Sequence, residues 1–175
     1  MSFVATIEID EENFFWLQSL RRERFPAERD LLSAHLTLFH KLGVSQIERL
    51  HSIGMPRAPL PLRFTGMRFF GSGVAVDIEA PELQRFREQL KSQLGGTLIL
   101  QDAQRWRPHV TVQNKVTPAT AKTLWAELSA GFAPRDGTAT ALRVWRYLGG
   151  SWSLAGRFTF GSALGPGRPS AKDSG

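Results

Sequence analysis

The sequence predicts an α+β fold of two related lobes around a central groove, each lobe a β-α-β-α-β-β unit with an antiparallel sheet. Alternating β-branched segments and amphipathic helical segments follow each other in the same order twice along the chain. Short stretches repeat at a growing offset, from 70 residues between Val4 and Val74 to 78 between Arg68 and Arg146. The chain of 175 residues is 42% hydrophobic, which suffices for one core.

The first half of the chain begins with an alternating strand and a helix that has acidic residues in its first turn. Asp10 can cap this helix and Pro26 ends it. The Gly-Ser-Gly sequence at 71–73 is a turn between two strands. In order, the pattern predicts a strand at 3–9, a helix at 10–25, a strand at 33–39, a helix at 44–54 and strands at 60–70 and 73–79.

The second half repeats this order and opens on a helix with Pro81 in its first turn and Gly95 after its end. Thr117 is the expected cap of a later helix. The pattern predicts a helix at 80–96, an edge strand or loop at 97–103, a strand at 107–116, a helix at 117–132 and a closing hairpin at 138–148 and 151–160.

The two repeats span about 1–73 and 74–161, so we expect one bilobal domain over residues 1–161 with a pseudo-two-fold axis. Residues 162–175 are rich in Gly, Pro and Ser and lack apolar periodicity. Such a composition predicts a disordered tail.

Composition limits the classes of function. The chain has no cysteine, which excludes disulfides, thiolate nucleophiles and cysteine-bearing zinc sites. It has no long apolar run and no signal sequence, so we expect a soluble, cytoplasmic protein, not a membrane protein. We also expect a monomer. The formal net charge of +6 suits a phosphate-bearing partner such as RNA or a nucleotide.

Two of the four histidines lie in matching strands, "AHLTLF" and "PHVTVQ", 74 residues apart. Because side chains alternate along a strand, His35 and Thr37 share one face of the first strand, and His109 and Thr111 share one face of the second. A two-fold axis would bring these faces together across the groove between the lobes, where small-molecule sites concentrate.

Two imidazoles suit a reaction that removes a proton from one oxygen and gives a proton to another. An unperturbed pKa near 6.5 allows one ring to be neutral and the other charged. Opening a cyclic phosphodiester with water is such a reaction, and its reverse would join ends. The threonine hydroxyls could hold the non-bridging phosphate oxygens, and the scheme requires no metal or cofactor.

The paired H-x-T motifs, "HLTL" and "HVTV", resemble those of the two-histidine (2H) phosphoesterase superfamily, nearest its bacterial 2'-5' RNA ligase and cyclic phosphodiesterase branch. The likeness covers roughly residues 1–161. It implies a bilobal fold and metal-independent action on 2',3'-cyclic phosphates of RNA ends or nucleotides, or on 2'-5' linkages, with ring opening that often leaves a 2'-phosphate. It also implies a catalytic set of His35, Thr37, His109 and Thr111.

One departure concerns the arginine that several relatives place after the second motif. This chain continues "QNKV", so Lys115 is the candidate for that charge if the strand stays regular. Phe39, on the histidine face, is a candidate platform for a base. The other expected substrate-binding residues share the histidine face or hold matching places in the repeat, namely Gln113, Arg68, Arg146 and Tyr147.

Two other functions remain open on the sequence. An RNA- or nucleotide-binding module could keep the groove without significant turnover. A metal-dependent hydrolase has less support, since no H-x-x-x-H or matching carboxylate spacing is present. His40, expected on the face opposite His35, and His51, on a short helix, fit surface or packing roles better than chemistry.

Overall fold

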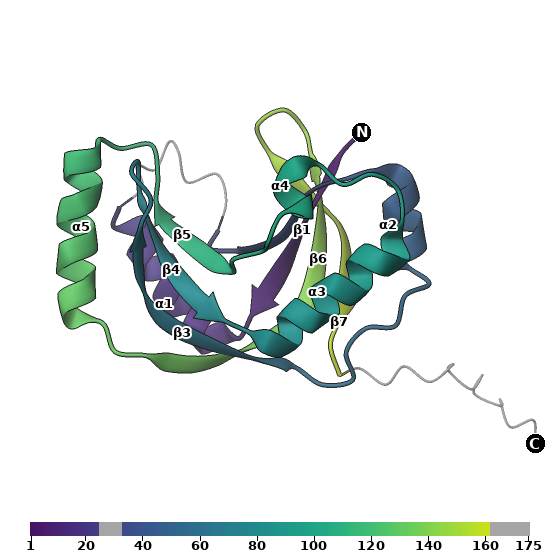
Figure 1. Ribbon diagram of the computed structural model, residues 1–175, viewed down its shortest axis with the longest axis horizontal. Coiled ribbons are helices and arrows are strands. Elements are labelled where there is room, and N and C mark those ends of the chain that lie inside the picture. The colour runs from purple at the N-terminus through teal and green to yellow at the C-terminus, as the bar shows by residue number, and fades with distance from the viewer. Residues whose placement is uncertain (25–32, 162–175) are drawn as a thin grey trace, which may run out of the picture.

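The computed structural model describes residues 1–24 and 33–161, and the tail expected to be disordered lies outside this part. Within it, seven strands form one antiparallel sheet that curls into a half-barrel (Figure 1). The strand order is β2-β1-β6-β3-β4-β5, and β7 pairs with β6. This is the mixed α and β architecture with antiparallel pairing that the sequence predicts.

The observed elements follow the predicted order. The strands are β1 (Phe3–Ile9), β2 (Leu36–Leu42), β3 (Leu60–Phe69), β4 (Val74–Glu79), β5 (His109–Gln113), β6 (Arg135–Tyr147) and β7 (Trp152–Thr159). The described helices are α1 (Glu11–Arg22), α2 (Val44–Leu50), α3 (Pro81–Leu94), α4 (Leu100–Ala103) and α5 (Pro118–Gly131). None of these helices has the length and hydropathy needed to cross a membrane.

Local signals begin the helices where the sequence places them. The Asp10 carboxylate accepts a hydrogen bond from the backbone N–H of Asn13 at 3.1 Å, and Thr117 caps α5 through the N–H of Thr120. Pro81 and Pro118 stand in the first turns of α3 and α5, where a missing N–H has no cost.

Residues 97–103 differ from the prediction of an edge strand or loop, because the segment ends in the short helix α4. The neighbouring edge of β2 is already occupied there: the carboxylate of Asp102 accepts the backbone N–H groups of His40 and Lys41. With those donors paired to a side chain, a strand has no ladder to join at this place.

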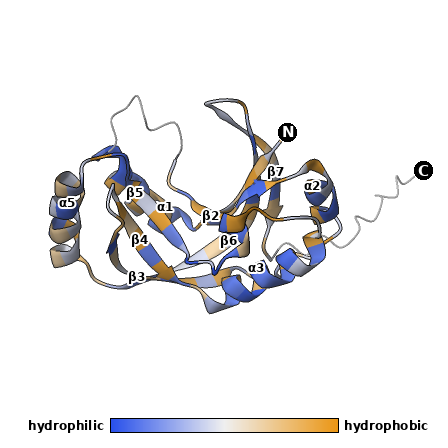
Figure 2. Cartoon of the chain, turned by 45° about the horizontal axis from the view of Figure 1, so that its top comes forward, coloured by the Kyte–Doolittle hydropathy of each residue, from blue (hydrophilic) through white to orange (hydrophobic). Residues whose placement is uncertain are grey.

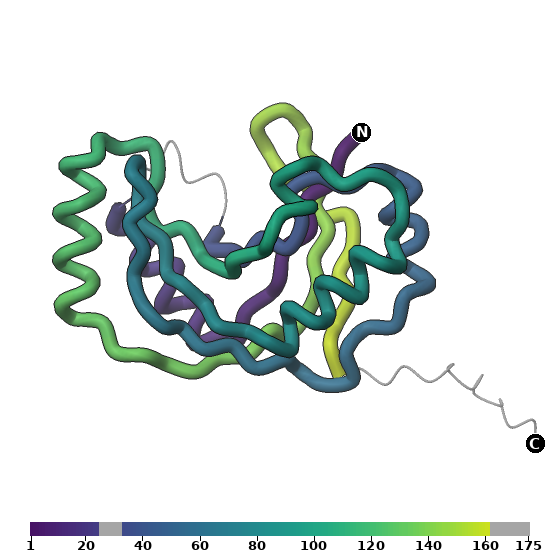
Figure 3. Tube along the Cα trace, in the orientation of Figure 1, coloured from purple at the N-terminus to yellow at the C-terminus, as the bar shows by residue number. Residues whose placement is uncertain are grey.

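The two halves of the sheet mix both halves of the chain. β6 pairs with β1, β3 pairs with β4, and β3 and β6 meet in the middle, as the crossing traces in Figure 3 show. The helices cross over as well, since Trp16 of α1 packs edge-on against Phe64 of β3 with ring centroids 5.3 Å apart. Each half of the half-barrel is therefore built from strands of both halves of the chain.

The core lies between the sheet and the helices. On α3 the residues Leu83, Phe86, Leu90 and Leu94 are buried at helical spacing, while hydrophilic residues cover the outward surface of this helix (Figure 2). The odd-numbered residues of β1 are buried on the core face. The even-numbered ones lie on the opposite, concave face, together with both H-x-T motifs.

Candidate functional site

The first histidine motif begins at His35, immediately before β2, and continues into that strand, whereas the second lies on β5. These two strands are the ends of the strand order β2-β1-β6-β3-β4-β5. The curl brings these ends together, since Cα atoms of β2 come within 8 Å of Cα atoms of β5. Each motif also accepts a hydrogen bond from the other half of the chain: Trp106 Nε1 donates to the carbonyl of Thr37 at 3.1 Å, and Arg21 Nη1 of α1 donates to the carbonyl of Thr111 at 2.7 Å. The charge of His109 also acts on His35.

The two imidazoles are held in the same way. His35 Nδ1 lies 2.8 Å from the carbonyl oxygen of Ser33, and His109 Nδ1 lies 2.8 Å from that of Arg107. A carbonyl only accepts, so Nδ1 is the protonated nitrogen in both rings. Each ring therefore keeps Nε2 for proton exchange, either as a base or, when charged, as an acid.

Burial lowers the pKa of His35 and of His109 below 6.5 because it penalises the charged ring. The hydrogen bonds to the carbonyls oppose this effect, whereas the guanidinium of Arg21 lowers the pKa of His35 further and that of Arg68 lowers the pKa of His109. Without a ligand, both rings are mainly neutral at pH 7. An anion between them would favour protonation of one ring.

Each threonine lies in a row that ends in an arginine. Thr37 is paired with Thr6 and Thr6 with Arg143, across β2, β1 and β6. In the other half, Thr111 is paired with Ala75 and Ala75 with Arg68, across β5, β4 and β3. Paired residues share a face of the sheet, so each hydroxyl has a guanidinium on its own face two strands away.

An acid in each half holds that arginine together with a second one. Glu8 pairs with Arg143 and with Arg157, the latter at 2.8 Å, and the hydrogen bond from Arg157 lowers the pKa of Glu8 to about 2 against the opposing effect of burial. Asp77 pairs with Arg68 at 3.1 Å and with Arg107 at 2.9 Å. The two halves thus carry the same arrangement of acid and arginines.

A β-bulge follows each H-x-T motif and changes the expected faces. Thr6 is opposite Thr37 but Ala5 is opposite Phe39, and the register of β5 against β4 shifts in the same way between Thr111 and Gln113. Phe39 is 0% exposed and Gln113 is buried. The expectations that Phe39 offers a base platform and that Gln113 faces the substrate are therefore wrong in this structure, since both side chains turn into the core.

Two more expected residues lie elsewhere. Arg146 is opposite Phe3, whose side chain is on the core face, so Arg146 does not lie on the histidine face and Arg143 takes the matching place. Lys115 lies after the end of β5 and has a φ of 59°. The regular strand that would put its side chain on the histidine face therefore does not extend to it.

Tyr147 and Arg68 lie on the histidine face of the sheet, Tyr147 two residues after Trp145 and Arg68 in the row that ends at Thr111. Tyr147 is exposed and is paired with Trp152, whose ring centroid lies 5.6 Å from that of His35. Arg68 is half-buried and pairs with Asp77, which is opposite His109 in the sheet. These two residues and Arg143 are the candidates for contact with the substrate.

Three arginines at the site escaped the sequence reasoning. Alternation along β6 from Tyr147 would have found Arg143. Arg21 and Arg87 are buried on amphipathic helices, where an arginine is expected to be exposed, so no sequence signal marks them. Each donates to a carbonyl in the motif strand from the other half of the chain, Arg21 to Thr111 and Arg87 to Leu38.

A cavity lies beside each half of the site. One, of about 470 Å³, is lined by His35, Glu8, Arg143, Phe14 and Phe15 among others. The other, of about 620 Å³, lies beside Asp77, Arg105, Trp106 and Arg107. Among residues 1–24 and 33–161, no three His, Cys, Asp or Glu side chains gather as a metal site would require.

Comparisons with known proteins agree with this geometry. The family model described as "2'-5' RNA ligase superfamily" matches residues 8–151. No curated protein matches the chain. Among solved structures, TT0787 of Thermus thermophilus is 17% identical with a TM-score of 0.62, over 93% of this chain and 100% of that one.

Two further structures share the fold. Escherichia coli LigT, crystallised with NADP+, is 16% identical with a TM-score of 0.57, over 92% of this chain and 98% of LigT. A protein described only as a phosphoesterase is 14% identical with a TM-score of 0.59, over the same shares. The family match spans most of the sequence, and the chain therefore belongs to the 2'-5' RNA ligase superfamily.

Proposed function

We propose that this protein is a metal-independent phosphodiesterase that opens 2',3'-cyclic phosphates of RNA ends or nucleotides with His35 and His109 as acid and base. The observation that carries the proposal is the matched anchoring of both rings by Nδ1, which leaves two equivalent Nε2 atoms on converging strands. Membership of the superfamily and the phosphoesterase among its structural neighbours support an enzyme.

In hydrolysis, the neutral ring accepts a proton at Nε2 from water while the water oxygen bonds to phosphorus. The bond between phosphorus and one sugar oxygen breaks, and Nε2–H of the other, protonated ring gives its proton to that oxygen. The product is a phosphomonoester with a free hydroxyl beside it. With the 5'-hydroxyl of a second RNA chain in place of water, the same pair would open the ring, break the bond from phosphorus to the 3'-oxygen and form a 2'-5' linkage.

The surrounding side chains favour the transition state through charge. Thr37 and Thr111 donate hydrogen bonds to the non-bridging oxygens, and Arg68 and Arg143 supply permanent positive charge on the same face. The bound phosphate also raises the pKa of the nearer imidazole, which loads the proton that the departing oxygen needs. In the free enzyme both imidazoles are neutral. Binding of the anionic substrate leads to protonation of one of them, which supplies the acid that the reaction needs.

The substrate class is proposed from charge and from a relative. The net charge of +6 favours phosphate-bearing ligands. LigT of Escherichia coli has been crystallised with 3'-AMP and with ATP, which fits a nucleotide in the corresponding groove. Both histidines come from one chain, so we propose that a monomer suffices, and we place its activity in the cytoplasm.

The direct test is incubation with adenosine 2',3'-cyclic phosphate, with and without EDTA. The proposal predicts hydrolysis that survives EDTA, falls by about 10²- to 10⁴-fold in His35→Ala and in His109→Ala, and persists in the matched control His51→Ala. Binding of the nucleotide without turnover would instead indicate a binding module, and activity lost with EDTA a metal-dependent hydrolase. Either result refutes the proposal.

A further inference from the structure

A third histidine, His40, lies on β2 beyond Thr37, on the strand that His35 immediately precedes. Leu38 and Phe39 are both buried, so the bulge shifts the alternation and His40 returns to the face of Val4 and Thr6. The expectation that His40 lies opposite His35 is wrong for this reason.

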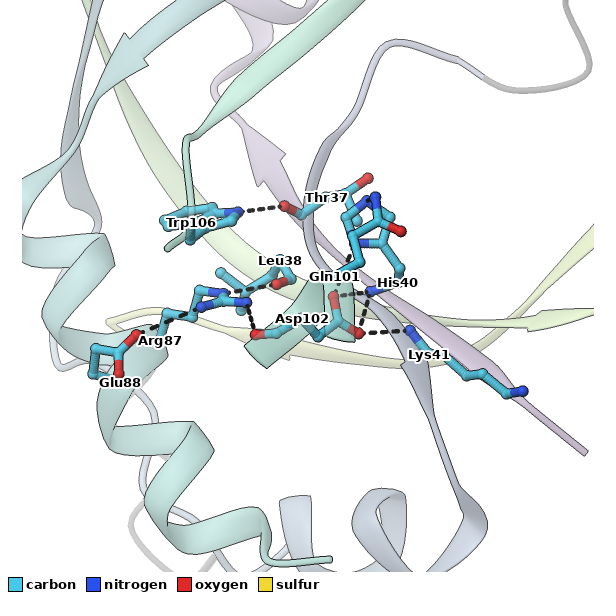
Figure 4. Close-up of polar contacts among 9 residues, drawn as sticks. All are labelled: Thr37, Leu38, His40, Lys41, Arg87, Glu88, Gln101, Asp102 and Trp106. Carbon is cyan, nitrogen blue, oxygen red and sulfur yellow. Dashed lines mark hydrogen bonds and ion pairs between the residues drawn. The ribbon is translucent and has the colours of Figure 1, made fainter. Parts of the chain in front are cut away.

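A buried carboxylate holds the His40 ring (Figure 4). The side chain of Asp102 is 1% exposed, and its Oδ1 lies 2.8 Å from His40 Nδ1. The backbone N–H groups of His40 and Lys41 donate to the same carboxylate at 2.9 and 3.0 Å. These bonds hold the pKa of Asp102 below its usual range although burial opposes them, so the group is an anion.

The backbone donors already satisfy Asp102, so the imidazole is not needed to support the carboxylate. The His40 side chain is 37% exposed, and with Nδ1 bonded to Asp102 its Nε2 is the outward nitrogen, 3.1 Å from the Gln101 amide nitrogen. Two cationic side chains lie near His40. Lys41 is exposed, whereas the guanidinium of Arg87 is buried and donates to the carbonyls of Leu38 and Asp102.

We propose that His40, oriented by Asp102, binds a backbone phosphate of an RNA chain whose terminal cyclic phosphate lies between His35 and His109. This inference rests on the proposed function. Because the Asp102 carboxylate takes Nδ1–H, the imidazole donates from Nε2 to the chain phosphate as an imidazolium. The Gln101 amide nitrogen, which contacts Nε2 in the free protein, then turns to donate to the same phosphate. His40 then selects chain ends over single nucleotides, because a nucleoside cyclic phosphate has no second phosphate to offer.

The test compares two substrates that share the reacting group, adenosine 2',3'-cyclic phosphate and a triadenylate ending in a 2',3'-cyclic phosphate. In His40→Gln we expect kcat/KM for the triadenylate to fall about tenfold, as for the loss of one charge-assisted hydrogen bond, and kcat/KM for the mononucleotide to stay within about twofold. The slope of log kcat/KM against log salt should weaken by about 0.7 for the triadenylate alone.

Two variants serve as controls. His40→Arg keeps a cation at the position and should retain most of the preference for the triadenylate. His51→Gln removes a histidine whose ring packs on Phe158, and it should change neither substrate. Equal losses for both substrates in His40→Gln would show that His40 acts through the scaffold, which would overturn the inference. No loss for the triadenylate would also overturn it.

Binding separates this inference from the proposed function. If the wild-type protein opens neither cyclic phosphate, the proposed function fails, and titration with 3'-AMP and with triadenylate 3'-phosphate still tests His40. We expect His40→Gln to weaken binding of the triadenylate about tenfold and to leave 3'-AMP unchanged. An equal affinity of wild type and variant for the triadenylate would refute a phosphate site at His40.

Discussion

Glu8 pairs with two arginines at the groove, and its lowered pKa predicts how much its carboxylate contributes to the free energy of unfolding. Its pKa falls from 4.5 to about 2, and at 1.36 kcal/mol per pH unit this difference gives an upper limit of about 3.4 kcal/mol. The side chains of Arg143 and Arg157 are 33% and 44% exposed, so solvent screening reduces the contribution to about 1–2 kcal/mol. Glu8→Gln should lower the free energy of unfolding by that amount at pH 7.

The pH dependence gives the sign of this effect. A carboxylate whose pKa is lower in the folded than in the unfolded protein stabilises the fold above the unfolded value of 4.5, and the contribution is lost as the pH falls through about 2. Urea denaturation of wild type and Glu8→Gln from pH 7 to pH 2 should therefore show a difference that is constant above 4.5 and shrinks below it.

A surface ion pair supplies the matched control. Asp136 lies 2.7 Å from Arg63, but its side chain is 79% exposed, so Asp136→Asn should cost less than about 0.5 kcal/mol. The reasoning is refuted if Glu8→Gln is no more destabilising than this control, or if its effect does not change with pH.

Three further predictions concern the groove. Because burial lowers the pKa of both His35 and His109, kcat/KM should follow a bell-shaped pH profile with its maximum below pH 6.5, and a flat profile between pH 5 and 9 would exclude acid-base catalysis by the pair. Arg143→Met should raise KM about tenfold in steady-state assays, whereas Arg146→Met, on the opposite face, should stay within about twofold; equal effects would contradict the observed register. Phe39→Leu should cost about 1 kcal/mol in urea denaturation and leave KM unchanged, and a raised KM would show that the ring does contact substrate.

The sequence predicts the strands and helices well because each carries a local signal. The alternation in "HLT" and "HVT" places each histidine and its threonine on one face, and Asp10 and Thr117 mark helix starts. The bulges carry a weaker signal. Leu38 and Phe39 are adjacent apolar residues in a strand that should alternate, but in the second motif Gln113 is polar and gives no such warning.

Long-range features escaped prediction because they depend on which strands pair. Sequence similarity matches Arg68 with Arg146. In the sheet, however, the pairing of β6 with β1 puts Arg143, and not Arg146, in the position on the histidine face that corresponds to Arg68. From the sequence, Asp102 is expected in an edge strand or a loop. No local pattern shows that its carboxylate accepts the backbone N–H groups of His40 and Lys41 in β2. Polar side chains that satisfy distant backbone groups leave no periodic pattern.

The central claim is that both imidazoles act on one phosphorus atom. A crystal structure of the protein with adenosine 2'-phosphate, a phosphomonoester that the proposed ring opening would give, tests it most directly. The account predicts phosphate oxygens at about 2.6–3.2 Å from Nε2 of His35 and from Nε2 of His109 in the same molecule. A phosphate bound in the groove by only one of these rings, or by neither, would contradict it.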